Sequence, residues 1–306
     1  MIAIHDISKS FGAAKALDHV SLQVREGELF GLIGPDGAGK TTLMRILTTL
    51  LLPDGGQASV DGWDIRKDYR RIRCEVGYMP GRFSLYQDLS VEENLRFFAT
   101  LFGTTVAANY DTIREIYSQI EPFRKRRAGQ LSGGMKQKLA LSCALVHQPR
   151  VLFLDEPTTG VDPVSRKEFW DILARIKARG ITIFVSTPYM DEAGRCDRVA
   201  LIEKGRILAV DRPSDIVARF PLPLLAVRAQ GETYRLLQEL RRQPLAHSVF
   251  PFGEYMHVAL STPLGADEVR AFLSARGYKA PEAFGIAPGI EDCFMELMDE
   301  KNSPQG

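Results

Sequence analysis

The residues best suited to chemistry lie in a glycine-rich segment, GPDGAGKTT, at residues 34–42. It follows the apolar run LFGLI and precedes TTLMRILTTLL, so a buried strand should lead into it and a helix should follow. Glycines let backbone N–H groups turn towards phosphate oxygens, and a helix start adds partial positive charge. Lys40 is expected to reach the β- and γ-phosphates, and the Thr41 hydroxyl to ligate Mg²⁺. The segment therefore predicts a nucleotide-phosphate site made by Gly34, Pro35, Asp36, Gly37, Ala38, Gly39, Lys40, Thr41 and Thr42.

Two adjacent carboxylates end a second apolar run, VLFLDEP, at 151–157. Burying such a pair for stability alone would be costly, so a nearby cation is the economical explanation. We expect Asp155 to hold Mg²⁺ and Glu156 to orient or deprotonate the attacking water as general base. Two exposed acids at a strand end remain the simpler interpretation of this segment by itself. Beside a phosphate loop, the pair indicates nucleotide hydrolysis.

A third segment, LSGGMKQ at 131–137, combines a capping residue with two glycines. Ser132 is expected to cap the helix that follows, and Gly133 and Gly134 allow close backbone approach to an anion. Taken alone, the segment is better explained as a plain helix cap with glycines. Its place just ahead of VLFLDEP favours a second phosphate contact.

In this order the three segments resemble the motifs of the ATP-binding subunits of ABC transporters, over residues 1 to about 218. The resemblance implies that two subunits enclose two ATP molecules head to tail, with Mg²⁺. Ser132 and Gly134 would then serve the nucleotide of a partner subunit. It also implies that Phe11 stacks on adenine and that Asp162, in TTGVDP (158–163), faces the partner.

Three positions depart from that family pattern. Gly81 follows GYMP where the family has a glutamine that touches Mg²⁺ and the attacking water, and Gln87 is no obvious substitute. Pro188, in VSTPYMDEA, replaces a histidine that donates to the γ-phosphate, and proline offers neither a side-chain donor nor an N–H. Asp36 replaces an asparagine. One lost transition-state donor typically costs about 10²–10³ in rate, so we expect ATP binding to persist and hydrolysis in this chain's own site to be weak.

The elements expected to position these residues alternate between strands and helices, which predicts an α/β sheet. The first 218 residues should form a P-loop NTPase domain with antiparallel β and helical subdomains. Pro221 and Pro223 then interrupt the chain, and residues 219–306 should form a small α+β domain of ferredoxin-like type with a regulatory or dimer-supporting role. Its closing stretch, PGIEDCFMELM, resembles the end of drug- and polysaccharide-exporter ATPases such as the daunorubicin-exporter subfamily.

Charge and hydropathy limit the classes of partner that the chain is expected to bind directly. The net charge is +1, so no overall field recruits nucleic acid, and the four separated cysteines suggest reduced, buried thiols. No apolar run approaches the ~18 residues of a spanning helix. Any membrane role should therefore come through a polytopic permease, at the cytoplasmic face, together with a second nucleotide-binding domain as homo- or heterodimer.

Two other functions stay open. A soluble ABC ATPase acting on ribosomes or DNA usually carries two nucleotide domains or a long coiled-coil insertion, whereas this chain has one nucleotide domain and only ~50 residues between Gly81 and Leu131. The chain could also be a non-hydrolysing subunit that binds ATP and stabilises a dimer, and Pro188 in place of the histidine favours this function.

Overall fold

The computed structural model describes residues 1–231, 233–261 and 265–302. The chain divides into two compact units, Met1–Pro213 and Ser214–Gly306. This division lies a few residues before the expected 218/219 boundary. The short helix α7 (Pro213–Ala218) accounts for the difference, because Cys293 Sγ of the second unit lies 3.8 Å from the Ile216 carbonyl oxygen.

A six-stranded sheet forms the centre of the first unit, in the order β10-β9-β3-β8-β7-β6. Its strands are β3 (Leu29–Ile33), β6 (Val76–Met79), β7 (Val151–Asp155), β8 (Thr182–Thr187), β9 (Arg198–Glu203) and β10 (Arg206–Asp211). All are parallel except β10, which forms an antiparallel hairpin with β9 over Lys204 and Gly205. Every residue of β3, β7 and β8 is buried, as the continuous apolar runs predict for parallel strands covered on both faces.

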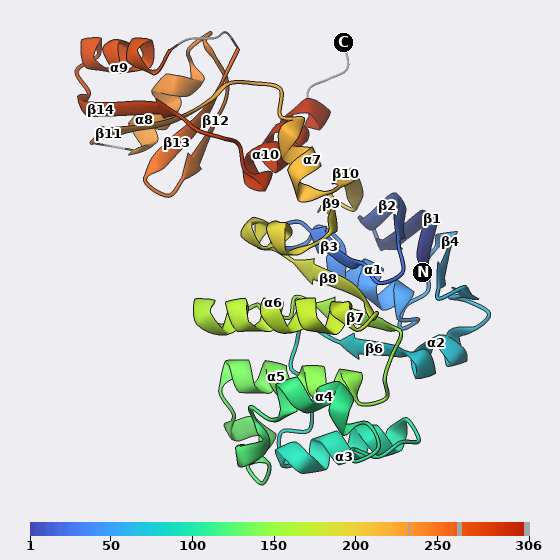
Figure 1. The fold of residues 1–306 in the computed structure, drawn as a ribbon. Helices are drawn as coiled ribbons and strands as arrows, with labels where there is room; N and C mark the ends of the chain where they lie inside the picture. Colours follow the sequence, from blue (N-terminus) through green and yellow to red (C-terminus); the bar gives the residue numbers. More distant parts are fainter. Residues whose placement is uncertain (232, 262–264, 303–306) are drawn as a thin grey trace. The chain divides into compact units, whose positions relative to one another are not determined.

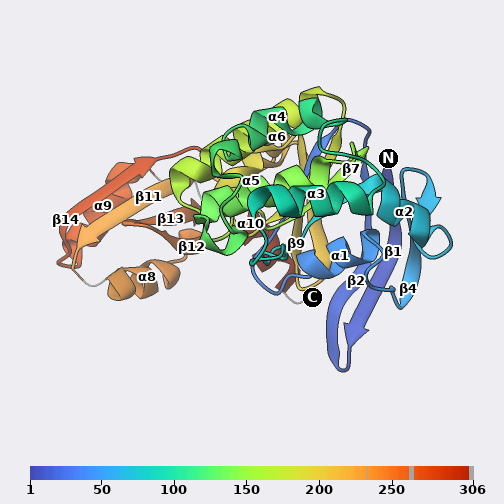
Figure 2. The same ribbon diagram turned by 90° about the horizontal axis from the view of Figure 1, so that it is seen from below.

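A second sheet, antiparallel, has the order β2-β1-β4-β5. Its strands are β1 (Ile2–Phe11), β2 (Ala14–Val24), β4 (Gly55–Val60) and β5 (Trp63–Asp64); Figure 2 shows β1, β2 and β4 side by side. The helix after the phosphate loop, α1 (Lys40–Leu47), is shorter than its apolar pattern suggested. One hydrophobic core joins this helix to both sheets through residues such as Ile4, Leu43 and Phe153. The phosphate loop is thus supported from two sides.

The remaining helices of the first unit lie mostly on one side of the parallel sheet (Figure 1). They are α2 (Tyr69–Glu75), α3 (Val91–Leu101), α4 (Tyr110–Tyr117), α5 (Gly133–Leu145), α6 (Pro163–Ala178), and the 3₁₀ turns η1 (Glu121–Phe123), η2 (Ala128–Gln130) and η3 (Met190–Arg195). A capping box starts α3, since Ser90 and Glu93 exchange side-chain and backbone hydrogen bonds, and the Ser-x-x-Glu spacing in the sequence is typical of this motif. Helices α3, α4 and α5 gather beyond α6 as the helical subdomain.

The second unit is a split βαβ arrangement of ferredoxin-like type, as expected. It comprises β11 (Leu224–Gln230), α8 (Thr233–Arg241), β12 (Ala246–Phe252), β13 (Tyr255–Leu260), α9 (Ala266–Ala275), β14 (Lys279–Gly285) and α10 (Ile290–Asn302). All strand pairs are antiparallel, in the order β12-β13-β11-β14. The sequence pattern missed β14, because this edge strand contains Pro281 and few apolar residues.

The expectation of four buried thiols was wrong for Cys74, which is exposed near the end of α2. Cys143, Cys196 and Cys293 are buried and unpaired. Burial raises the pKa of the Cys143 and Cys196 thiols, and that of Cys293 to about 11. Among the residues described, no helix has both the length and the apolar composition needed to cross a membrane.

Candidate active site

The loop between β3 and α1 can be built only with glycine at two positions. A Cβ atom on Gly39, where φ is +104°, would lie 2.4 Å from the Ala16 carbonyl oxygen. One on Gly34 would lie 2.1 Å from the Ile202 carbonyl oxygen. The loop also accepts a hydrogen bond from the β9–β10 turn, from Gly205 N to Ala38 O at 3.0 Å. Neighbouring backbones therefore fix the loop, which preorganises it for phosphate.

Lys40 begins α1 and is 3% exposed, yet its ammonium group has several polar partners. Nζ donates to the carbonyl oxygens of Gly34 (2.8 Å) and Pro35 (2.9 Å). It also lies 3.1 Å from Glu156 Oε1. The charge at the phosphate loop is thus held next to the candidate general base, where phosphate oxygens could exchange for these partners.

The two candidate metal ligands meet although they are far apart in the sequence. Thr41 Oγ1 donates to Asp155 Oδ1 at 3.1 Å, and Asp155 is almost fully buried at the end of β7. These two oxygens, next to the phosphate loop, fit Mg²⁺, which binds through one or two protein oxygens plus substrate phosphates. The described residues contain no cluster of three or more His, Cys, Asp or Glu side chains suited to a metal. When bound, Mg²⁺ would neutralise charge on the phosphates.

Glu156 adopts an unusual backbone conformation for a non-glycine residue, with φ of 49°. Its N–H donates to the Ser186 hydroxyl oxygen at 3.0 Å, and the Ser186 hydroxyl donates to Asp155 Oδ1 at 2.8 Å. Ser186 therefore links the backbone of the candidate base to the candidate metal ligand. The arrangement can bind a nucleotide triphosphate and direct a carboxylate at an attacking water.

Comparison with known proteins decides the family. The family model described as ABC transporter matches residues 17–159. The Nod factor export ATP-binding protein I of Rhizobium sp. (strain N33) is 35% identical over 97% of this chain and 96% of its own length. The chain belongs to the ABC transporter family of ATP-binding proteins. It is accordingly an ABC ATPase that binds ATP.

Two further comparisons each cover 72% of the chain. The probable multidrug ABC transporter ATP-binding protein YbhF of Escherichia coli (strain K12) is 42% identical over 72% of this chain. The match spans only 38% of the length of YbhF. A solved structure of an ATP-binding subunit of an ABC transporter superposes with a TM-score of 0.66 at 30% identity, over 72% of this chain and 93% of that one. The α/β P-loop fold with antiparallel and helical subdomains is that of ABC ATPases.

The signature segment of this ABC ATPase lies at the exposed start of α5. Ser132 is the N-cap of α5, and its hydroxyl accepts a hydrogen bond from Met135 N at 3.4 Å. Gly133 is exposed and has space for a side chain, whereas a Cβ on Gly134 would lie 3.0 Å from Ser165 Oγ. These exposed groups are free to meet a nucleotide from outside the chain.

Two other residues assigned through the family are also exposed. Phe11, at the end of β1, is 53% exposed, so the alternative of core packing is excluded. Asp162 caps α6 by accepting from Ser165 N at 3.0 Å, and that hydrogen bond lowers the pKa of its carboxyl group. Both side chains are accessible for the contacts expected of them.

The departures from the family pattern have structural consequences. A Cβ on Gly81 would lie 3.0 Å from the Asp155 carbonyl oxygen and 3.8 Å from Glu156 Cβ. Glycine thus lets this loop approach the end of β7 unusually closely. Gln87 does not take the place of the missing glutamine, because its carbonyl oxygen and side chain lie against Gly129 in the helical subdomain. Asp36 is exposed.

Sequence reasoning missed three polar residues beside this site: Ser186, Arg166 and Glu192. A signal was available for Ser186, since it lies near the carboxyl end of a buried strand, as Asp155 does. Parallel strands present such ends at one edge of the sheet, where ligands bind. Nothing in the sequence pairs Arg166 with Glu192.

Proposed function

We propose that this ABC ATPase powers export through a separate membrane-spanning permease, as one of two nucleotide-binding domains, at the cytoplasmic face of the membrane. The observation that carries the proposal is the meeting of Lys40, Thr41, Asp155 and Glu156 around the phosphate loop. Those residues would hold Mg·ATP, with Glu156 as general base. The export role is supported by the names of the relatives, which include multidrug and Nod factor export ATP-binding proteins.

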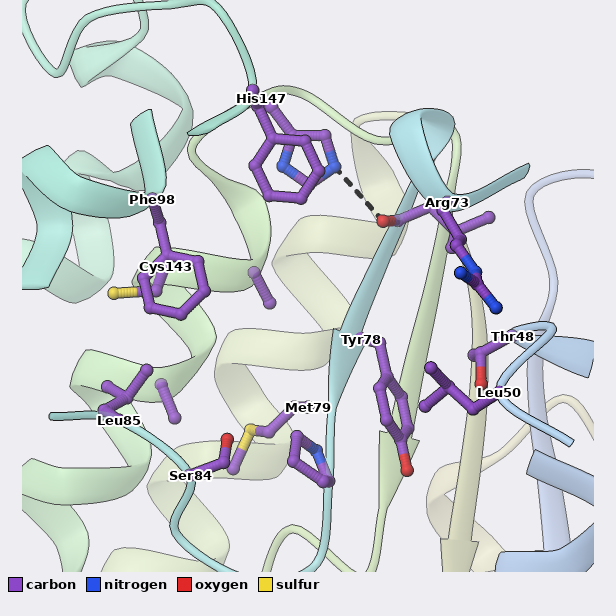
Figure 3. Close-up of a pocket in the computed structure, with 15 residues that line it drawn as sticks. Thr48, Leu50, Arg73, Tyr78, Met79, Ser84, Leu85, Phe98, Cys143 and His147 are labelled. Atoms are coloured by element: carbon purple, nitrogen blue, oxygen red, sulfur yellow. Dashed lines mark hydrogen bonds between the residues drawn. The ribbon is translucent and has the colours of Figure 1, made fainter. Parts of the chain in front are cut away.

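An apolar groove beside the site supports a permease partner. The groove, of about 190 Å³, lies between β6 and the helical subdomain and is lined by Leu50, Tyr78, Met79, Phe98, Phe102 and His147, among others. Figure 3 shows Phe98 and His147 on one side of the groove and Leu50 and Tyr78 on the other. Burial raises the pKa of Tyr78 to about 12 and lowers that of His147, so both rings are uncharged near neutral pH. The groove therefore suits an apolar permease segment.

Helix α3, which supplies Phe98 to the groove, also carries exposed apolar side chains. Leu101 at the end of α3 is 63% exposed, and Phe97 and Tyr86 pack edge to face at 5.0 Å while remaining partly exposed. Large exposed apolar patches usually mark binding surfaces. Because the groove wall includes Met79 and Pro80, a permease bound there would contact the chain immediately before Gly81. Partner binding and the hydrolytic site would then share one loop.

Co-purification tests the partner. Leu101→Glu, produced together with a candidate permease that binds the unaltered chain, should prevent recovery of the two proteins together, since a charge would be buried at the interface. Tyr234→Glu is the matched control, because Tyr234 is 72% exposed but belongs to α8 of the second unit. Equal recovery of both variants would exclude the groove as the permease site.

We further propose that this chain's own site hydrolyses slowly and that its signature segment serves the partner's ATP. The proposal rests on Gly81 and Pro188, together with the exposed Ser132 and Gly133. Gly133→Asp obstructs the partner's ATP more cleanly than Gly134→Asp would. A side chain at Gly133 meets only the Gly160 carbonyl oxygen at 3.8 Å, whereas one at Gly134 would lie 3.0 Å from Ser165 Oγ. In the reconstituted complex, Gly133→Asp should abolish most turnover and Glu156→Gln should leave most of it. Greater damage from Glu156→Gln would place hydrolysis in this chain's own site.

Two other functions receive less support. The segment between Gly81 and Leu131 folds into helices of 11 and 8 residues, α3 and α4, rather than a long coiled coil. This arrangement and the net charge of +1 favour a transporter over a ribosome- or DNA-directed ATPase. A purely structural ATP-binding partner differs from our proposal only in the fate of its own ATP.

A further inference from the structure

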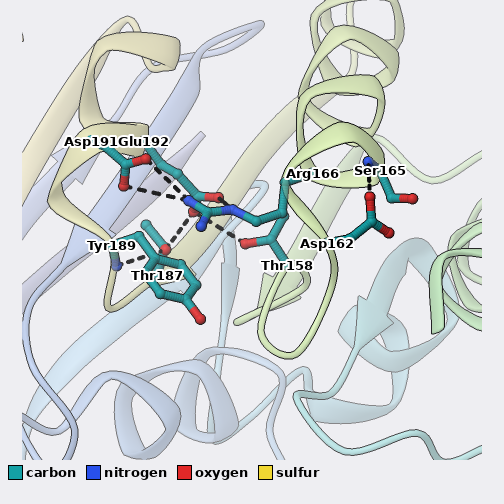
Figure 4. A network of polar contacts seen from close by, with 8 residues as sticks. All are labelled: Thr158, Asp162, Ser165, Arg166, Thr187, Tyr189, Asp191 and Glu192. Carbon is teal, nitrogen blue, oxygen red and sulfur yellow. Dashed lines mark hydrogen bonds and ion pairs between the residues drawn. The ribbon is translucent and has the colours of Figure 1, made fainter.

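Glu192, in turn η3, is a buried carboxylate that joins two loops of the site. Glu192 is only 3% exposed. Oε2 accepts hydrogen bonds from the hydroxyl groups of Thr158, at 3.1 Å, and Thr187. Oε1 accepts from Arg166 Nε at 3.1 Å. Figure 4 shows these donors converging on Glu192 from α6, from the end of β8 and from the segment after β7.

Arg166 closes the network from the first turn of α6. Its Nη2 lies 3.2 Å from Asp191 Oδ2, and its guanidinium group lies 4.1 Å from the centre of the Tyr189 ring. A carboxylate this deeply buried is stable only while its donors stay in place. The positions of Thr158, Arg166 and Thr187 relative to Glu192 are therefore tightly restrained.

The two ends of the network belong to different functional loops. Thr158 begins the TTGVDP segment, whose Asp162 caps the helix that carries Arg166. Thr187 immediately precedes Pro188, and its hydroxyl oxygen accepts a hydrogen bond from Tyr189 N at 3.1 Å. The backbone on both sides of Pro188 is thus attached to Glu192 without any contribution from position 188.

The network also reaches the phosphate loop. Gly34 N donates to the Thr187 carbonyl oxygen at 3.3 Å. Thr158 and Gly34 are consequently connected through Glu192 and Thr187. Every link in this path is a hydrogen bond except the step from the side chain of Thr187 to its own carbonyl group. A contiguous hydrogen-bonded path of this kind can carry energetic coupling between two loops.

We propose that Arg166 and Glu192 are positioning residues that couple the 158–163 segment to the 187–189 segment and the phosphate loop. The inference rests on the proposed ATP site and adds to it a route by which the partner-facing segment acts on the phosphates. Because the coupling runs through Thr187 and the backbone, it operates with proline at position 188.

Hydrogen exchange tests the coupling without nucleotide. Glu192→Gln could unfold the loops, so the test variant is Thr158→Val, which removes one hydroxyl and keeps the shape. Losing a hydroxyl–carboxylate bond should raise exchange of amides in 187–192 by roughly tenfold, although the substitution lies in the other loop. Thr159→Val is the matched control, because Thr159 is exposed and only its backbone is hydrogen-bonded. Equal exchange of 187–192 in the two variants would overturn the proposal.

ATP hydrolysis supplies an independent measurement. Arg166→Met should lower kcat by roughly tenfold or more while KM stays within about threefold, since the variant misaligns the loops for hydrolysis but leaves Lys40 and Thr41 in place to bind ATP. Arg166→Lys should recover part of the loss. Arg175→Met, on the same helix, breaks an exposed ion pair with Glu115 and should leave kcat unchanged. Equal kcat in the two methionine variants would contradict a positioning role. Failure of the wild-type chain to bind ATP would refute the proposed site, whereas the exchange experiment would still decide the coupling.

Discussion

Restoring a histidine at position 188 is the most direct test of slow hydrolysis in this chain's own site. Pro188 follows β8, and Thr187 beside it accepts from Gly34 N of the phosphate loop at 3.3 Å. A side-chain donor introduced at position 188 would therefore lie next to the residue that is hydrogen-bonded to the phosphate loop. A donor directed at transition-state charge is typically worth about 10²–10³ in kcat. We expect Pro188→His to raise kcat at least tenfold above that of the wild-type chain. KM should stay within about threefold, because Lys40 and Thr41 are unaffected.

The assay is steady-state ATP hydrolysis by the purified chain and by its complex with a permease. Pro188→Ala is the control, because it restores a backbone N–H without an imidazole ring. Wild-type turnover equal to that of Pro188→His would show that another group already supplies the donor. Equal rates for the alanine and histidine variants would show that the side chain does nothing. Either result would make Pro188 a tolerated variation.

Combining Gly81→Gln with Pro188→His is also expected to raise the rate above wild type, but by less than the product of two gains. A Cβ at position 81 would lie 3.0 Å from the Asp155 carbonyl oxygen, so the loop or the end of β7 must shift. Gly81→Ala separates this steric cost from the chemistry of the amide. A double variant that gains the full product would show that Gly81 imposes no constraint.

Three further outcomes are expected. Lys40→Ala should abolish tight binding of a slowly hydrolysed Mg·ATP analogue in calorimetry, because the ammonium group lies at the phosphate loop; unchanged binding would remove the central claim. Ser186→Ala removes the hydroxyl that joins Asp155 Oδ1 to the backbone N–H of Glu156. It should lower kcat for ATP hydrolysis by roughly ten- to a hundredfold. Thermal melting should show that the variant remains folded. A thiol reagent at neutral pH should modify only Cys74 in the folded chain, as counted by mass spectrometry, because burial raises the pKa of the other three thiols.

Much of the fold followed from local sequence. The continuous apolar runs at β3, β7 and β8 specified buried parallel strands, and the capping box at Ser90 fixed the start of α3. The glycine-rich pattern of residues 34–42 marked the loop between β3 and α1. Local patterns sufficed here because strand burial, helix caps and positive φ angles depend on neighbouring residues.

Other features depended on pairs of residues distant in the sequence. Thr41 and Asp155 meet across 114 positions, and the hydroxyl of Ser186 joins Asp155 to Glu156. The family resemblance placed the first pair but gave no indication of the second.

The sequence alone thus determined which residues could bind phosphate, hold Mg²⁺ and act as base, and it showed that Gly81 and Pro188 break the pattern. Only the tertiary structure decided that Gly81 lies against the end of β7, that Cys74 is exposed and that Arg166 and Glu192 join two loops. The physical reason is that motif residues carry their chemistry in their own side chains and neighbours. The partners of a buried carboxylate, by contrast, are chosen by how the strands and helices pack.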